Sequence, residues 1–246
     1  MPVERRNEFE SLPLDTVLWR YMDFTKFISM LVTNRLWLAR ADCLGDAFEG
    51  WMPAPRAEDY DGLLAEQLLE QDRKLFKNLP ELRKSFYANC WHANKGESDA
   101  MWKLYVKGGE GIAIRTTVRD LKAALNDAAE TLHLADVLYR DHKAKPRIGS
   151  TMPLACMTKR ECFQHEREVR LFYIDERPEA NSTNAIHPEG IAIKCNMSAL
   201  IKTVHVAWSK PHWLKPIVKD ILEKYNIQAE VEELDLTSEP HWDQTV

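Results

Sequence analysis

The segment FQHEREVRLFY, residues 163–173, places two glutamates and two arginines directly in front of an apolar run. If this segment is a strand, Glu166 and Glu168 point to the same face, because side chains two apart share a side of a strand. Two carboxylates in one site raise the pKa of one of them. Such a pair suits an oxocarbenium-like transition state, with Glu168 as the essential acid and Glu166 as its helper. The alternative is a solvated strand face, with Arg167 and Arg170 as ion-pair partners.

Two arginines in apolar surroundings are candidates for binding an anion. Arg20 lies in VLWRYM and Arg40 in RLWLARA, and a guanidinium fork suits a phosphate or a diol. The alternative for Arg20 is a position at a sheet rim, paired with Asp46 or Glu49 of the loop GDAFEG. That loop lacks the spacing of a calcium loop. A loop carboxylate that orients Arg20 is the favoured interpretation.

The segment CWHANKGESDAMWKLY, residues 90–105, combines aromatic and polar residues. Ser98, Met101, Trp102 and Tyr105 share one face of a predicted helix, since residues three and four apart are neighbours there. A core stripe is the default interpretation. The functional alternative is a nicotinamide or a base stacked on Trp102 or Tyr105.

Several common chemistries find no support in the sequence. GGEG at 108–111 lacks the order of a phosphate-binding loop, and no G-x-S-x-G is present. The five cysteines include no C-x-x-C pair, and the histidines lack metal-ligand spacing. We therefore expect no metal and no disulfide framework.

Composition is that of a soluble globular chain, with 45% hydrophobic and 29% charged residues and a net charge of −5. The N-terminus shows no signal-peptide pattern, and no apolar run approaches the roughly 20 residues of a membrane helix. We expect a cytoplasmic protein with no membrane partner. Its oligomeric state is not evident.

Hydrophobic periodicity predicts strands mixed irregularly with helices. Strands are predicted at 17–22, 35–41, 85–92, 112–118, 134–140, 169–174, 190–195, 203–208 and 229–234. Helices are predicted at 23–34, 97–105, 119–130 and 211–225, with two more between 58 and 85 separated at Pro80. This order favours an α+β fold, with a twisted or split mixed sheet flanked by helices. We predict an extension at 1–16, a single domain at 17–235 and a tail at 236–246.

Three blocks together carry a resemblance to a bacterial family described as a domain of unknown function. They are LWRYMDFTKFISMLVTNRLWLARADCLGDAFEG, CWHANKGESDAMWKLYVKGGEGIAIRT and KRECFQHEREVRLFY. The resemblance covers most of residues 17–210, and it implies no activity.

A more distant resemblance is to ADP-ribosyltransferases, which begin with a strand bearing a basic residue, then a helix and a short strand. Arg20 matches that basic residue, and Glu166-Arg167-Glu168 matches the late E-x-E. ANCWH stands where the arginine-type enzymes have a Ser-x-Ser or Ser-x-Thr strand. The resemblance implies an ADP-ribosyltransferase-like fold with NAD as substrate. It also implies Glu168, Glu166 and Arg20 as catalytic residues, with Glu49 and Arg170 orienting them.

The NAD-binding residues that this resemblance implies are Arg20, Tyr21, Arg40, Trp91, His92, Trp102 and Tyr105. The acceptor is a protein, a nucleic acid or water, and by analogy the role is that of a toxin or a phage-defence protein. Two alternatives stay open. One is a metal-dependent nuclease or phosphotransferase, built from Asp42, Asp46, Glu49, Glu97, Glu166 and Glu168. The other is a non-catalytic binding module.

Overall fold

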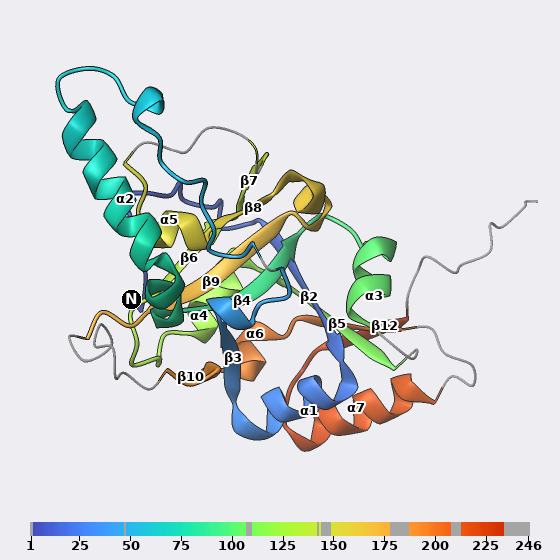
Figure 1. Cartoon of the computed structure of the whole chain (residues 1–246). Helices are drawn as coiled ribbons and strands as arrows, with labels where there is room; N and C mark the ends of the chain where they lie inside the picture. The colour runs from blue at the N-terminus through green and yellow to red at the C-terminus, as the bar shows by residue number, and fades with distance from the viewer. Residues whose placement is uncertain are drawn as a thin grey trace, which may run out of the picture. The chain divides into compact units, whose positions relative to one another are not determined.

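The computed structural model describes residues 2–46, 48–106, 110–141, 143, 149–177, 187–207 and 213–233 (Figure 1). The chain divides into two compact units. Unit 1 comprises Met1–Pro13, Arg35–His92 and Leu125–Cys195, and unit 2 comprises Leu14–Asn34, Ala93–Ala124 and Asn196–Val246. Each unit is considered by itself below. Among the described helices, none is both long and apolar enough to cross a membrane.

Unit 1 contains a mixed sheet. Its strands are β1 (Val3–Glu4), β3 (Arg35–Arg40), β4 (Phe86–Ala93), β6 (Leu132–Asp136), β9 (Glu168–Ile174) and β10 (Gly190–Lys194). The order β1-β6-β9-β4 continues through β3, which pairs with β4 and β10. The β1–β6 pair is parallel, whereas β9 is antiparallel to both β6 and β4. The central strand β9 is therefore hydrogen-bonded along both edges.

Helices and a small second sheet complete unit 1. They are η1 (Ala41–Cys43), η2 (Ala57–Asp59), α2 (Ala65–Leu82), η3 (Arg83–Ser85), α5 (Met152–Cys156), η4 (Glu161–Glu166) and the parallel strands β7 (Leu138–Arg140) and β8 (Thr158–Arg160). The predicted strand 134–140 is wrong in one respect, because it is divided between β6 and β7. Because of this division β7 pairs with β8, the strand that carries Lys159.

The predicted helix break at Pro80 is wrong, because Pro80 lies inside the continuous helix α2. Proline removes one backbone donor and crowds the preceding turn. Here it stands two residues before the helix ends at Leu82, so few helical bonds remain to be disturbed. The neighbouring Leu79 is buried with Met52 and Ala155, and this packing holds the last turn in place.

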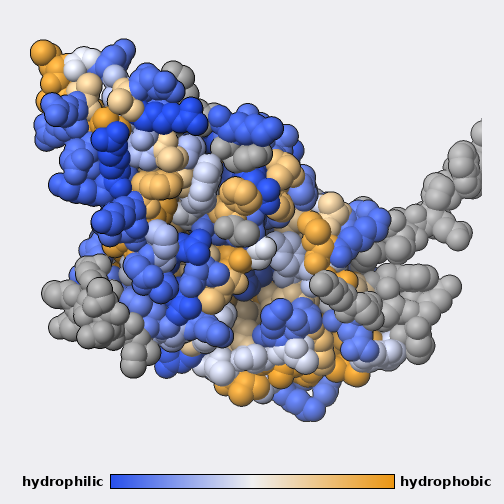
Figure 2. All heavy atoms as spheres, viewed as in Figure 1, coloured by the Kyte–Doolittle hydropathy of each residue, from blue (hydrophilic) through white to orange (hydrophobic). Residues whose placement is uncertain are grey.

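The beginning of α2 carries exposed apolar side chains. Leu63 is fully exposed and Leu64 is 60% exposed. Figure 2 shows apolar atoms at that end of the helix. Leu64 occupies the N-cap position and provides no side-chain hydrogen bond. The first amides of α2 are thus left uncapped by this residue, which is a weak start for a helix.

Unit 2 contains the second group of strands, in the order β2-β5-β11-β12. They are β2 (Val17–Asp23), β5 (Gly111–Thr117), β11 (Thr203–Val206) and β12 (Glu230–Glu233). Only the β11–β12 pair is parallel among these. The helices of the unit are α1 (Phe24–Thr33), α3 (Asp99–Tyr105), α4 (Val118–Ala124), α6 (Met197–Leu200) and α7 (Leu214–Lys224). Asp23 caps α1 by accepting from the Lys26 amide, as its position predicts.

The predicted α+β class, with a mixed sheet flanked by helices, is confirmed. The domain boundaries stay a prediction. Strand β1 falls within the predicted extension, while the predicted tail, residues 236–246, lies outside the described residues.

The pairing of β10 with β3 depends on a glycine. A Cβ added at Gly190 would lie 2.6 Å from the backbone oxygen of Leu38 and 2.3 Å from the Trp37 ring. Gly190→Ala should therefore lower the free energy of unfolding by about 1–3 kcal/mol, because strand pairing must shift. Gly45→Ala is the matched control, since its Cβ would meet nothing within 4 Å. Urea unfolding measures both. An equal response of the two variants would contradict the prediction.

Candidate functional site

Strand β9 brings two opposite charges into the interior of unit 1. Glu168 and Arg170 lie on the same face, and both side chains are almost completely buried, at 4% and 1% exposed. The Arg170 Nε donates to Glu168 Oε1 over 2.7 Å. Buried charges of this kind are stable only when paired. The pair therefore explains how a strand enters the core with charged residues.

Arg170 also binds a second carboxylate. Its Nη2 donates to both oxygens of Glu49, each 2.9 Å away. Its Nη1 donates to the carbonyl oxygen of Cys156 at the end of α5. Glu49 comes from the loop after η1, so this one guanidinium joins the sheet, a loop and a helix end.

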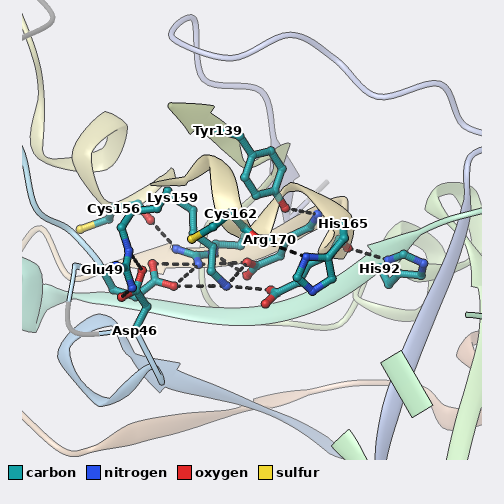
Figure 3. A network of polar contacts seen from close by, with 12 residues as sticks. Asp46, Glu49, His92, Tyr139, Cys156, Lys159, Cys162, His165 and Arg170 are labelled. Carbon is teal, nitrogen blue, oxygen red and sulfur yellow. Dashed lines mark hydrogen bonds and ion pairs between the residues drawn. The ribbon is translucent and has the colours of Figure 1, made fainter. Parts of the chain in front are cut away.

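Lys159, on β8, meets all three glutamates of the site. Its Nζ lies 2.7 Å from Glu166 Oε2, 3.1 Å from Glu168 Oε2 and 3.5 Å from Glu49 Oε1. We call Glu49, Glu166, Glu168, Lys159 and Arg170 the glutamate cluster (Figure 3). Three carboxylates share two cations here, so the cluster carries one excess negative charge when all five groups are ionised.

The predicted geometry of the E-x-E segment is wrong. Glu166 ends the 3-10 helix η4, and β9 begins only at Glu168. Between them Arg167 has a φ of 39°, in the left-handed region. The two glutamates are therefore not neighbours on one strand face. Their carboxylates still meet, because both reach the ammonium group of Lys159.

The electrostatics of the cluster also differ from expectation. Burial by itself would raise the pKa of Glu168, but Arg170 and Lys159 outweigh burial and lower it to about 2. Burial raises the pKa of Glu49, opposed by Arg170 and Lys159 and assisted by the charge of Glu168. The carboxyl group whose pKa is raised is therefore Glu49, and burial is the main cause. Glu168 stays ionised at neutral pH.

The lowered pKa of Glu168 predicts a pH dependence of stability. Its ordinary value is 4.5, and its folded value is about 2. Its ionised form therefore stabilises the fold fully above pH 4.5, and this contribution is lost as the pH falls toward 2. At about 1.4 kcal/mol per pH unit, the loss is roughly 3 kcal/mol.

Urea unfolding at pH 7, 5, 4 and 3 measures this effect. Subtracting the profile of Glu168→Gln isolates it from Glu49, whose raised pKa acts in the opposite sense. Parallel profiles for wild type and variant below pH 4.5 would contradict the assignment.

Two neutral groups adjoin the cluster. The Tyr139 hydroxyl accepts from the Glu168 amide over 2.7 Å, and burial raises the pKa of this tyrosine to about 12. His92 Nδ1 lies 2.6 Å from the carbonyl oxygen of Glu166. Burial lowers the pKa of His92, which favours the neutral ring. Both groups hold the backbone at the beginning of β9.

A second ion pair lies beside the cluster. Arg160 donates through Nη2 to Asp46 Oδ1 over 2.7 Å and through Nε to Asp46 Oδ2 over 3.3 Å. Its guanidinium carbon lies 4.4 Å from the centre of the Phe48 ring, a cation–π distance. Asp46 thus binds Arg160 through both of its carboxylate oxygens.

A pocket opens in unit 1 next to these groups. It holds about 550 Å³ of empty space, part of it open to solvent. The lining residues that matter here are Phe48, Trp51, Arg140, Thr158, Lys159 and Arg160. Lys159 belongs both to this lining and to the glutamate cluster. It connects the buried carboxylates to a space that a ligand can enter.

The predicted site residues of unit 1 have distinct surroundings. Arg40 pairs with Asp42 over 2.6 Å. Trp91 is 2% exposed, which leaves almost no area for a ligand. His92 lies beside the cluster, as described above. The roles predicted for Arg40, Trp91 and His92 toward NAD stay predictions.

The remaining predicted residues lie in unit 2. Arg20 and Tyr21 lie on β2, and the Tyr21 hydroxyl accepts from the Ser98 amide over 3.1 Å. Burial raises the pKa of Tyr21 to about 12. Trp102 is buried in a core cluster and contacts Tyr21 edge-to-face at 5.1 Å, whereas Tyr105 is 45% exposed. The core interpretation thus describes Trp102, whereas Tyr105 is partly exposed.

Each acidic residue named for the metal-dependent alternative contacts a cationic side chain or a histidine. Asp42 pairs with Arg40, Asp46 with Arg160, and Glu97 approaches His205 Nδ1 to 2.7 Å. Glu49, Glu166 and Glu168 share Lys159 and Arg170. Within the described ranges, no group of three or more metal-ligating side chains is placed to hold a metal ion.

Sequence reasoning missed Lys159, Arg160 and Tyr139. The basic pair Lys159–Arg160 lies only a few residues before Glu166, and a search for cations near the E-x-E segment would have found it. Tyr139 had no comparable signal, because the pairing of β7 with β8 brings it to Glu168.

Comparisons with known proteins find distant structural similarity. No protein-family model matches the chain, and no curated protein sequence does either. The solved structure "Thermus sp. 2.9 DarT in complex with NAD+" is 12% identical, covers 91% of this chain and 98% of that one, and has a TM-score of 0.41. The complex of the same protein with carba-NAD+ is also 12% identical, with 91% and 97% coverage and a TM-score of 0.40. Its complex with ADP-ribosylated ssDNA is 12% identical, with 92% and 97% coverage and a TM-score of 0.39. At this level of similarity the chemistry has to be argued from the site itself.

Proposed function

We propose that this chain is an ADP-ribosyltransferase-like enzyme that cleaves the nicotinamide–ribose bond of NAD. One observation carries the proposal. Glu168 is a buried, ionised carboxylate, and its partner Lys159 lines an open pocket. The reaction transfers ADP-ribose to an acceptor and releases nicotinamide, and the acceptor is a protein, a nucleic acid or water.

The chemistry explains why an ionised carboxylate is needed. When the bond between ribose and nicotinamide breaks, positive charge develops on the ribose as an oxocarbenium-like species. A fixed negative charge stabilises that species most strongly where water is excluded. Glu168 has a lowered pKa and is 4% exposed, so it is charged and held in place before the reaction begins.

The other cluster residues have supporting roles in this proposal. Arg170 and Lys159 fix the Glu168 carboxylate, and Glu49 holds Arg170 from its other side. Glu166 shares Lys159 with Glu168, and in this proposal it polarises an acceptor hydroxyl.

Nicotinamide release from NAD by the purified chain tests the proposal. The reaction is run alone and with cell lysate as a source of acceptors, in EDTA and in added magnesium. We expect release that is unaffected by EDTA, because no step of the mechanism uses a metal. Absence of release, together with no thermal shift on adding NAD, would refute the proposal. Release that requires magnesium would favour the metal-dependent alternative.

The binding-module alternative has one observation in its favour. Every carboxylate of the glutamate cluster is paired, as in a structural ion-pair network. In that case substitution of Glu168 would alter stability alone.

A further inference from the structure

The pocket of unit 1 has one aromatic wall. Trp51 is 37% exposed, although tryptophan is among the side chains that gain most from burial. Phe48 meets it edge-to-face, with ring centres 5.5 Å apart and an interplanar angle of 78°. Both rings line the pocket. Trp51 is the partly exposed ring of this wall, and stacking on aromatic side chains is how proteins hold nucleobases without reading their sequence.

The lining also carries three cations, namely Arg140, Lys159 and Arg160, and one acid, Asp141. Arg160 uses Nε and Nη2 for Asp46, and its Nη1 has no hydrogen-bond partner among the described residues. The Arg160 side chain is 30% exposed, and its guanidinium lies over the Phe48 ring. A held guanidinium with a remaining donor is suited to a phosphate oxygen.

We propose that this pocket binds the nucleoside diphosphate part of a dinucleotide, with the base on Trp51 and Phe48 and the diphosphate at Arg140, Arg160 and Lys159. This inference rests on the proposed function, because it names the part of NAD that the pocket takes.

The position of Lys159 indicates how the proposed ligand is oriented in the pocket. Its ammonium group lies 3.1 Å from Glu168 Oε2. A diphosphate that reaches Lys159 from the aromatic wall therefore directs its second ribose toward the glutamate cluster. The carboxylate that the reaction needs lies on that side.

Isothermal titration calorimetry with ADP, AMP and adenosine tests the inference on three proteins. They are the wild type, Trp51→Ala and the control Trp37→Ala. Trp37 is also an exposed tryptophan of unit 1, at 54%, and is not part of the pocket lining. We expect ADP to bind more tightly than AMP, and adenosine most weakly. Trp51→Ala should weaken ADP binding by about tenfold or more. Trp37→Ala should bind ADP as the wild type does.

The outcomes separate this inference from the proposed function. No ADP binding by the wild type, or equal binding by wild type and Trp51→Ala, would overturn the pocket assignment. If nicotinamide release persists with an unchanged KM in Trp51→Ala, the assignment fails while the enzyme activity stands. If ADP binds as expected but no nicotinamide is released from NAD, the pocket assignment stands and the proposed reaction fails.

Discussion

Glu168→Gln should lower the rate of nicotinamide release by about a hundredfold or more, with little change in NAD binding. Glutamine keeps the shape of the side chain and can still accept a hydrogen bond from Arg170. It removes the negative charge, which the reaction needs only when positive charge develops on the ribose. An interaction made only in the transition state affects kcat and leaves KM nearly unchanged.

The matched control for this substitution is Glu161→Gln. Glu161 begins η4, the 3-10 helix that Glu166 ends, and its side chain is exposed. Both variants make the same chemical change in neighbouring parts of the chain. Circular dichroism checks that each is folded. A folded Glu168→Gln protein that releases nicotinamide at the wild-type rate would remove Glu168 from the mechanism and favour the binding-module alternative.

The elements of the fold were largely predictable, because they depend on local patterns. The apolar stripe and the Asp23 cap identified α1, and the apolar run after Glu168 identified β9. The predicted helix break at Pro80 is wrong, because the prediction treats proline as a break at any position in a helix. Its cost is small in the last turn of a helix whose Leu79 is buried.

The site was predictable only in part, because its geometry depends on contacts between distant segments. Glu168, Arg170 and Glu49 were selected from the sequence, and the structure brings them together. Lys159 was missed, since the three residues of β8 show no periodic signal and pair with β7, about twenty residues earlier. The left-handed backbone conformation of Arg167 could not be predicted either, because arginine has no preference for that conformation.

Arg170→Met should cause the largest loss of stability, about 3–5 kcal/mol in the free energy of unfolding. Methionine has a similar length and suits an apolar interior. It leaves the carboxylates of Glu49 and Glu168, which are 2% and 4% exposed, without their main partner. Lys159 cannot replace the lost charge, because its ammonium already contacts all three glutamates.

Arg56→Met is the matched control, since Arg56 is 74% exposed and pairs with an equally exposed Glu58. Its effect should stay within about 0.5 kcal/mol. Urea unfolding followed by circular dichroism measures both variants. Adding Glu168→Gln to Arg170→Met should restore part of the lost stability, because the double variant no longer buries that unpaired charge. If the double variant instead lost the sum of the two single effects, the buried charges would not be coupled. The lowered pKa of Glu168 would then need a source other than Arg170.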